Sequence, residues 1–105
     1  GGPAKAIFHS PNARVGGHVI LDGTDSIAIG HVTCTWIVEE GSGRKARKVK
    51  KKGCQVDYRF HRAGTAHVTL VVRGSVGRPS RLSRTLVVGS GQSGQLRVSK
   101  AARAF

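Results

Sequence analysis

Acidic residues are scarce in this sequence. Five Asp and Glu stand against eighteen Lys and Arg, which gives a formal net charge of +13. Asp57 is the last acid, and nine Lys or Arg follow it. Such a charge attracts nucleic acid, anionic lipid, acidic glycans or an acidic protein surface, but it says little about the fold. Calcium prefers a cluster of carboxylates, so five acids in all argue against a strong calcium site.

Aromatic residues and long apolar runs are also few. Aromatics make up 5% and hydrophobic residues 38% of the 105 residues, which predicts one domain with a thin core. No stretch approaches the roughly 18 apolar residues that a membrane span needs. No signal peptide is visible, and the start at Gly1 leaves open whether an initiator Met was trimmed or a leader was removed.

Hydrophobic and polar residues alternate along most of the chain, which is the period of β-strands with one buried face. In residues 54–60 every second residue is Cys, Val, Tyr or Phe, and in residues 31–38 the same spacing groups Trp36 with Cys34 and two valines. We therefore expect Trp36 to lie in the core. The alternation predicts six strands, at residues 4–9, 17–22, 31–38, 54–60, 67–72 and 82–88.

Gly, Pro, Ser, Asn and Asp punctuate these strands, as at Asp22-Gly23, and this favours tight turns. The predicted fold class is all-β: an immunoglobulin-like sandwich of two antiparallel sheets with an extended C-terminal tail. No helix is expected, because the one candidate, residues 44–51, lacks an apolar face. Residues 1–88 would form the sandwich, and residues 89–105 a Gly/Ser linker and basic tail.

The two cysteines, Cys34 and Cys54, both fall on inward-facing positions. They make a poor metal or redox site, because no CxxC is present and no His lies nearby at ligand spacing. Two buried free thiols remain the alternative. We favour a disulfide between neighbouring strands, worth on the order of 3 kcal/mol for a loop of this length. It would imply an oxidising setting, such as secretion or the outside of a virus particle.

Two segments resemble a known family of immunoglobulin-like domains. Residues 16–26 (GGHVILDGTDS) resemble the G-x-x-V-x-F-D-G-S-x-S opening of polycystic-kidney-disease (PKD) domains, and Trp36 falls where that family keeps a core Trp. Residues 58–72 (YRFHRAGTAHVTLVV) are similar to its H-x-Y-x-x-x-G-x-Y-x-V-x-L-x-V signature, with Phe60 in place of the Tyr. The W-x-F-G-D-G turn of the family is replaced here by WIVEEG.

The resemblance covers roughly residues 4–88 and implies a PKD-like sandwich. Some bacterial members also carry a Cys before the Trp and a second Cys after the following turn, as this sequence does. PKD domains are typically non-catalytic modules of secreted proteins and of surfaces, including those of viruses. Similar immunoglobulin-like folds decorate the outside of tailed-phage capsids.

Catalytic signals are weak. The carboxylate pairs Asp22/Asp25 and Glu39/Glu40 are best interpreted as turn-forming and charge-balancing residues. No nucleophile elbow is present. No enzyme, cofactor or metal site is therefore predicted. The histidines are scattered over separate strands and turns and are expected to be solvated: His9, His18, His31, His61 and His67.

The basic run at residues 44–52 is the best candidate for a binding site. We interpret it as a loop that binds a partner, in preference to a merely solvated hairpin loop, because seven charges in nine residues repel one another more than solubility requires. The aromatic residues near it belong to the core, so electrostatic docking is favoured over base-specific reading of nucleic acid. The predicted partner-binding residues are Arg44, Lys45, Arg47, Lys48, Lys50, Lys51 and Lys52 in the run, with Arg97, Lys100 and Arg103 in the tail.

Three functions compete. The first is a structural or decoration module on the virion surface that docks on an acidic protein assembly such as a phage capsid. The second is an extracellular adhesion domain that binds acidic glycans or cell surfaces. The third is a nucleic-acid binder held by charge alone, which a disulfide argues against because reducing cytosol would keep the bond open. The tail segment at residues 96–99 could also add as a strand to a neighbour's sheet.

Overall fold

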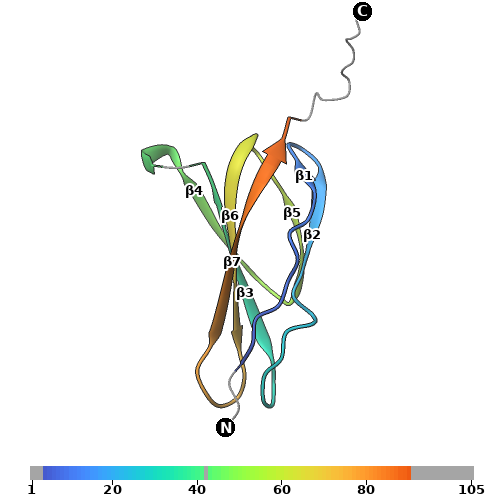
Figure 1. The fold of residues 1–105 in the computed structure, drawn as a ribbon, viewed down its shortest axis with the longest axis vertical. Helices are drawn as coiled ribbons and strands as arrows, with labels where there is room; N and C mark the ends of the chain where they lie inside the picture. The colour runs from blue at the N-terminus through green and yellow to red at the C-terminus, as the bar shows by residue number, and fades with distance from the viewer. Residues whose placement is uncertain (1–3, 42, 91–105) are drawn as a thin grey trace, which may run out of the picture.

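The computed structural model describes residues 4–41 and 43–90 and shows two β-sheets packed face to face (Figure 1). The larger sheet has the strand order β1-β7-β6-β3-β4, and the smaller one pairs β2 with β5. A single turn of 3-10 helix, Gly43–Lys45, precedes β4. The strands are β1 (Ala13–Arg14), β2 (His18–Asp22), β3 (Thr33–Glu40), β4 (Arg47–Lys52), β5 (Gln55–Arg59), β6 (Gly64–Arg73) and β7 (Ser80–Gly89).

The predicted all-β sandwich is confirmed, and every sheet pairing but one is antiparallel. The exception is β1, whose two residues pair in parallel with the end of β7. In the part of the chain that the structure describes, no helix is long and apolar enough to cross a membrane.

The core lies between the sheets and contains all four aromatic side chains of the described residues, each at most 3% exposed. Trp36 is fully buried, as expected, and donates a hydrogen bond from Nε1 to the carbonyl of Gly53 at 2.8 Å. Phe8 meets it edge to face, with 5.0 Å between ring centroids. Gly23 lies directly against this cluster, because a Cβ there would come within 2.7 Å of Leu70 Cδ2. The turn at Asp22-Gly23 therefore requires glycine for space, although the φ angle of Gly23 lies outside the left-handed region.

The first predicted strand, residues 4–9, has the expected faces but does not form a regular strand. Within the described ranges, its one backbone bridge joins Lys5 to Ile27. Serine side chains replace the missing ladder: the amide of Ala6 donates to Ser80 Oγ at 3.0 Å and that of Ile7 to Ser26 Oγ at 2.9 Å. Ala4, Ala6 and Phe8 are nevertheless buried, so the alternation predicted their environment correctly.

A disulfide joins Cys34 of β3 to Cys54, the residue just before β5, and so links the two sheets. The predicted bond is thus present, but it runs between layers. Two backbone hydrogen bonds hold the same corner: Gly53 donates to the carbonyl of Cys34 at 3.0 Å, and Gly23 donates to that of Cys54 at 2.7 Å.

Reducing this disulfide is expected to lower the free energy of unfolding by about 3 kcal/mol, because the open chain regains the conformational freedom of a loop of about 20 residues. The measurement is denaturant unfolding of the oxidised protein against a Cys34→Ala, Cys54→Ala double variant. Intact mass after thiol blocking gives the control. Alkylation of both cysteines in the native, unreduced protein would show that the bond is absent.

A basic edge strand as the candidate functional site

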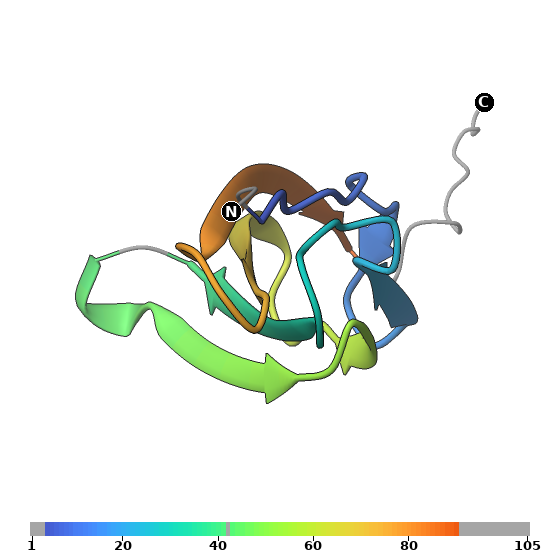
Figure 2. The same cartoon turned by 90° about the horizontal axis from the view of Figure 1, so that it is seen from below.

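The basic run is not a loop, contrary to the sequence prediction. Residues 47–52 form β4, which pairs with β3 over six consecutive residues, from Thr35 opposite Lys52 to Glu40 opposite Arg47. The preceding Arg44 and Lys45 lie in the 3-10 turn at the tip of the hairpin. Figure 2 shows this hairpin extending away from the two packed layers. The cations are thus held on a regular backbone, at fixed spacing.

The pairing register divides the cations of β4 between two faces. Because opposite residues in a ladder share a face, Lys48, Lys50 and Lys52 lie with Glu39, Ile37 and Thr35 on the outer side of the large sheet. Alternate residues of a strand are about 7 Å apart. This is shorter than the Debye length of about 8 Å at physiological ionic strength, so the three charges act on a partner together. We call these three residues the outer lysine row.

The other cations of β4 face the protein. Lys51 donates a hydrogen bond from Nζ to the carbonyl of Asp57 at 3.2 Å and lies 5.9 Å from the centre of the Tyr58 ring. Arg47 lies opposite Glu40, and Val49 packs against the core. Lys51 and Val49 attach β4 to the sandwich. The predicted set of seven thus divides into the outer lysine row, the inward-facing Arg47 and Lys51, and Arg44 and Lys45 in the turn.

No described carboxylate forms an ion pair with the outer lysine row. The ion pairs within residues 4–41 and 43–90 both involve histidine, joining His18 to Asp57 and His61 to Glu40. Lys48 lies opposite Glu39 in the register without forming an ion pair with it. Lys50 and Lys52 therefore face no acid across the ladder, whereas Glu39 partly offsets the charge of Lys48.

Among the described residues, the outer face beside the row carries no Phe, Tyr or Trp and is mostly polar, with Ile37 and Val71 as its apolar members near the row. Beyond β3, the ladder continues through Val71, Thr69 and His67 of β6. The β7 strand then adds hydroxyl groups, with Thr69 Oγ1 and Ser83 Oγ 2.8 Å apart. The face therefore offers cations and hydroxyls rather than stacking surfaces.

A buried carboxylate supports the base of the hairpin. Glu40 ends β3 and is 1% exposed, so it is not the solvent-facing turn residue that the sequence analysis assumed. It accepts a hydrogen bond from the Tyr58 hydroxyl and two more from the amides of His61 and Arg62, at 2.7 and 2.9 Å. Arg62 also donates from its guanidinium to the carbonyl of Lys45, which ties the hairpin tip to the same corner.

These contacts shift two pKa values. Burial by itself raises the pKa of the Glu40 carboxyl, but the hydrogen bonds it accepts outweigh burial and hold the pKa below the ordinary 4.5. Burial and the bond to Glu40 raise the pKa of Tyr58 far above its ordinary value of 10. Glu40 is thus an ionised acceptor and Tyr58 a permanent donor at neutral pH.

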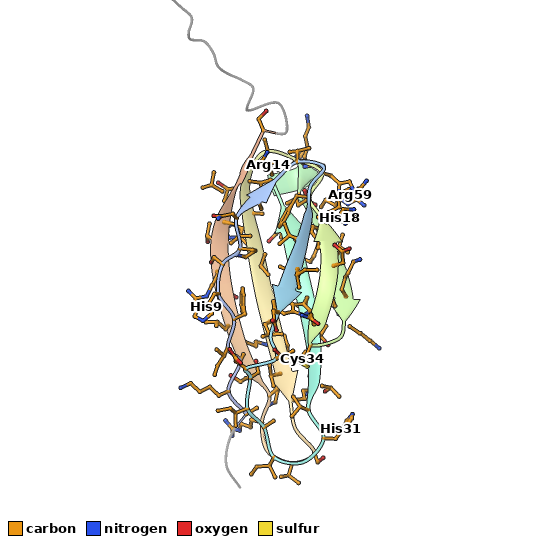
Figure 3. All side chains as sticks on the ribbon, turned by 90° about the vertical axis from the view of Figure 1, so that its right-hand side faces the viewer. His9, Arg14, His18, His31, Cys34 and Arg59 are labelled. Atoms are coloured by element: carbon orange, nitrogen blue, oxygen red, sulfur yellow. A yellow bond between two sulfur atoms is a disulfide. The ribbon has the colours of Figure 1, made fainter. Side chains whose placement is uncertain are left out.

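The histidines do not converge on one site. His18 and Arg59 lie side by side, while His31 lies at the opposite end of the molecule and His9 on another side (Figure 3). His18 is not simply solvated, since its Nδ1 is 3.0 Å from Asp57 Oδ1 and its Nε2 is 2.6 Å from an Arg59 nitrogen. No group of three His, Cys, Asp or Glu in the described ranges could hold a metal ion.

A pocket of about 420 Å³ lies at the Lys52 end of the row. Its walls carry no His, Asp, Glu or Ser, so it offers no acid-base pair or activated serine. The residues that line it are Val32, Thr33, Cys34, Thr35, Lys52, Gly53 and Cys54.

The predicted tail contacts at Arg97, Lys100 and Arg103 and the segment at residues 96–99 lie outside the described residues. Their part in binding therefore stays a prediction. Glu40 is the one residue of this region whose role the sequence analysis missed, although its parity with Trp36 and Val38 already placed it on the inward face.

Comparison with known proteins supports the fold. No protein-family model matches this sequence, and no curated protein matches it. A solved structure, described as "Structural basis for the promiscuous specificity of the carbohydrate-binding modules from the beta-sandwich super family", matches 86% of this chain with a TM-score of 0.66 and 22% sequence identity. The match covers 36% of that longer chain. At this identity the similarity establishes a shared β-sandwich architecture.

Proposed function

We propose that this chain is a non-enzymatic binding module that docks on an acidic macromolecular surface through β4. The observation that carries the proposal is the outer lysine row, three unpaired cations held about 7 Å apart on a regular strand. The backbone of β4 is already ordered in the free protein. Binding an extended anionic surface therefore costs it less conformational entropy than it would cost a flexible loop.

Protection of the sheet edge is the competing explanation. Natural sheets place lysine on exposed edges to prevent aggregation. In β4, however, five of the six residues are basic. We therefore infer that β4 attracts a partner in addition to repelling other copies of itself.

An acidic protein assembly is the first candidate partner. The chain would then act as a surface-display or decoration module, on a capsid for example. This assignment includes membership of the PKD-like family, which residues 16–26 and 58–72 resemble. The disulfide fits an extracellular or virion-surface location, because such bonds persist in oxidising compartments.

An acidic glycan is the second candidate. The hydroxyl-rich outer face beside the row favours it, as does the structural similarity to the chain from the carbohydrate-binding-module study. A neutral sugar fits less well, because all four described aromatic side chains are buried and none is free to stack on a sugar ring. The same burial disfavours nucleic acid held by base stacking.

Replacing Lys48, Lys50 and Lys52 together by serine is expected to weaken binding to immobilised poly-L-glutamate or dextran sulfate about tenfold or more. Three exposed charge contacts at roughly 0.5 kcal/mol each amount to about 1.5 kcal/mol, which is about a factor of ten. The measurement is equilibrium binding at several salt concentrations, where the wild-type affinity should fall steeply with salt.

The matched control removes the same charge elsewhere, by Lys5→Ser, Arg14→Ser and Arg78→Ser. These side chains are exposed, and Arg14 lies on β1 at the far edge of the sheet. Equal losses in both triple variants would mean that only net charge matters and that β4 is not a site. Deletion of residues 91–105 measures the predicted contribution of the tail in the same assay.

A further inference from the structure

The backbone of β4 is as distinctive as its side chains. The strand is last in the order of the large sheet and pairs on one side only, with β3. Its register is continuous over six residues, without a bulge, and the segment RKVKKK contains no Pro or Gly. An edge strand of this kind presents a row of unpaired N–H and C=O groups that can accept another strand.

The other sheet edges are less suited to accepting an added strand. On the opposite side of the large sheet, β1 covers only the last two residues of β7, and the segment at residues 4–9 lies against the rest of that edge, where the amide of Ala6 donates to Ser80 Oγ and Arg84 donates to the carbonyl of Phe8. The edge strands of the small sheet, β2 and β5, have five residues each and carry acids of their own, Asp22 and Asp57. Among the strands that the structure describes, β4 therefore combines a continuous free edge with charge of one sign.

We propose that β4 accepts an extended acidic segment of a partner protein as an added strand. This inference rests on the proposed function and narrows the partner to a protein. Backbone hydrogen bonds would supply affinity, and alternate side chains would supply specificity. The added strand would carry Asp or Glu at every second position, beside Lys48, Lys50 and Lys52, since opposite charges on neighbouring strands stabilise a sheet by roughly 0.2–1 kcal/mol per pair.

The charge also excludes the commonest alternative occupant. A second copy of this chain pairing through β4 would place lysine beside lysine, and like charges directly opposite are destabilising. A neutral strand would leave the charges of the outer lysine row without opposite charges beside them. The free edge of β4 therefore favours an acidic strand and disfavours the β4 strand of a second copy.

The test uses the full chain and a synthetic peptide, Thr-Glu-Val-Glu-Val-Glu-Val-Thr, with two N-methylated forms. One form is methylated on the odd-numbered amides and the other on the even-numbered amides. Because the amides of a strand point alternately to its two sides, only one set can donate to β4. Binding is expected to fall at least tenfold for one methylated form and to stay within about twofold for the other, by titration calorimetry at low salt.

A second readout is amide hydrogen exchange of residues 47–52. Binding of the unmodified peptide is expected to slow exchange at alternate residues of β4. The Lys48→Ser, Lys50→Ser, Lys52→Ser variant, which keeps the backbone edge, is expected to lose most of the affinity for the peptide. The Lys5→Ser, Arg14→Ser, Arg78→Ser control should retain it.

The outcomes separate this inference from the proposed function. Equal binding by all three peptides, without slowed exchange in β4, would overturn the added strand and leave electrostatic docking intact. Binding of dextran sulfate, but of neither poly-L-glutamate nor the peptides, would also overturn it and favour a glycan partner. If none of these anions distinguishes the outer lysine row from the control charges, the proposed function itself is wrong.

Discussion

Replacing Trp36 by alanine is expected to lower the free energy of unfolding by about 3 to 5 kcal/mol. The side chain is fully buried between the sheets, packs edge to face against Phe8 and holds the carbonyl of Gly53 by a hydrogen bond. Removing it leaves a large cavity and a carbonyl without its donor. Equilibrium denaturation monitored by circular dichroism measures the change, because the variant loses the only tryptophan fluorophore.

The neighbouring residue provides the control. Ile37 follows Trp36 in β3 but points to the outer face and is only partly buried. Ile37→Ala should therefore cost no more than about 1 kcal/mol. A loss for Trp36→Ala as small as that for Ile37→Ala would mean that the indole is not part of the core.

Replacing Glu40 by alanine is expected to destabilise the protein by a similar amount, about 3 to 5 kcal/mol. Glu40 accepts hydrogen bonds from the Tyr58 hydroxyl and from the amides of His61 and Arg62. Without the carboxylate these donors lose their acceptor, at about 1–3 kcal/mol for each one left unsatisfied. Glu39→Ala is the matched control, since Glu39 lies on the outer face, and it should change stability little.

The same carboxylate makes stability depend on pH. The pKa of Glu40 is lowered in the folded state, so its stabilising contribution is complete above the ordinary pKa of 4.5 and is lost as the pH falls through the lower folded value. The wild type should therefore lose stability below about pH 4.5, and Glu40→Gln should lose less over that range. Identical pH profiles for the wild type and Glu40→Gln would contradict the lowered pKa.

The sequence predicted β3 and β5 well because both strands alternate in a half-buried setting. The parity of Cys34, Trp36 and Val38 in β3 matches their burial, and Tyr58 and Phe60 likewise follow the alternation. A strand with one face on the core and one in water has a period of two, and that period is readable from residue types alone.

The strand that carries the candidate site could not be predicted in this way. In β4 only Val49 is apolar, because an edge strand that projects from the sandwich has solvent on most of its surface. Its high density of charge is typical of a loop, and a loop is what the sequence analysis predicted. What defines β4 as a strand is its hairpin ladder with β3, a pairing that composition does not record. The β1–β7 pairing was missed for the same reason.

The disulfide closes a covalent ring that includes the hairpin of β3 and β4. Residues 34–54 form a closed covalent ring, and the ring contains the 3-10 turn, the whole of β4 and all seven cations of the basic run. A protease that cuts at Arg44 or Lys45, at the tip, would nick the ring without releasing a fragment. The sandwich and the severed strand would stay joined through sulfur wherever the bond persists, as it does in oxidising compartments.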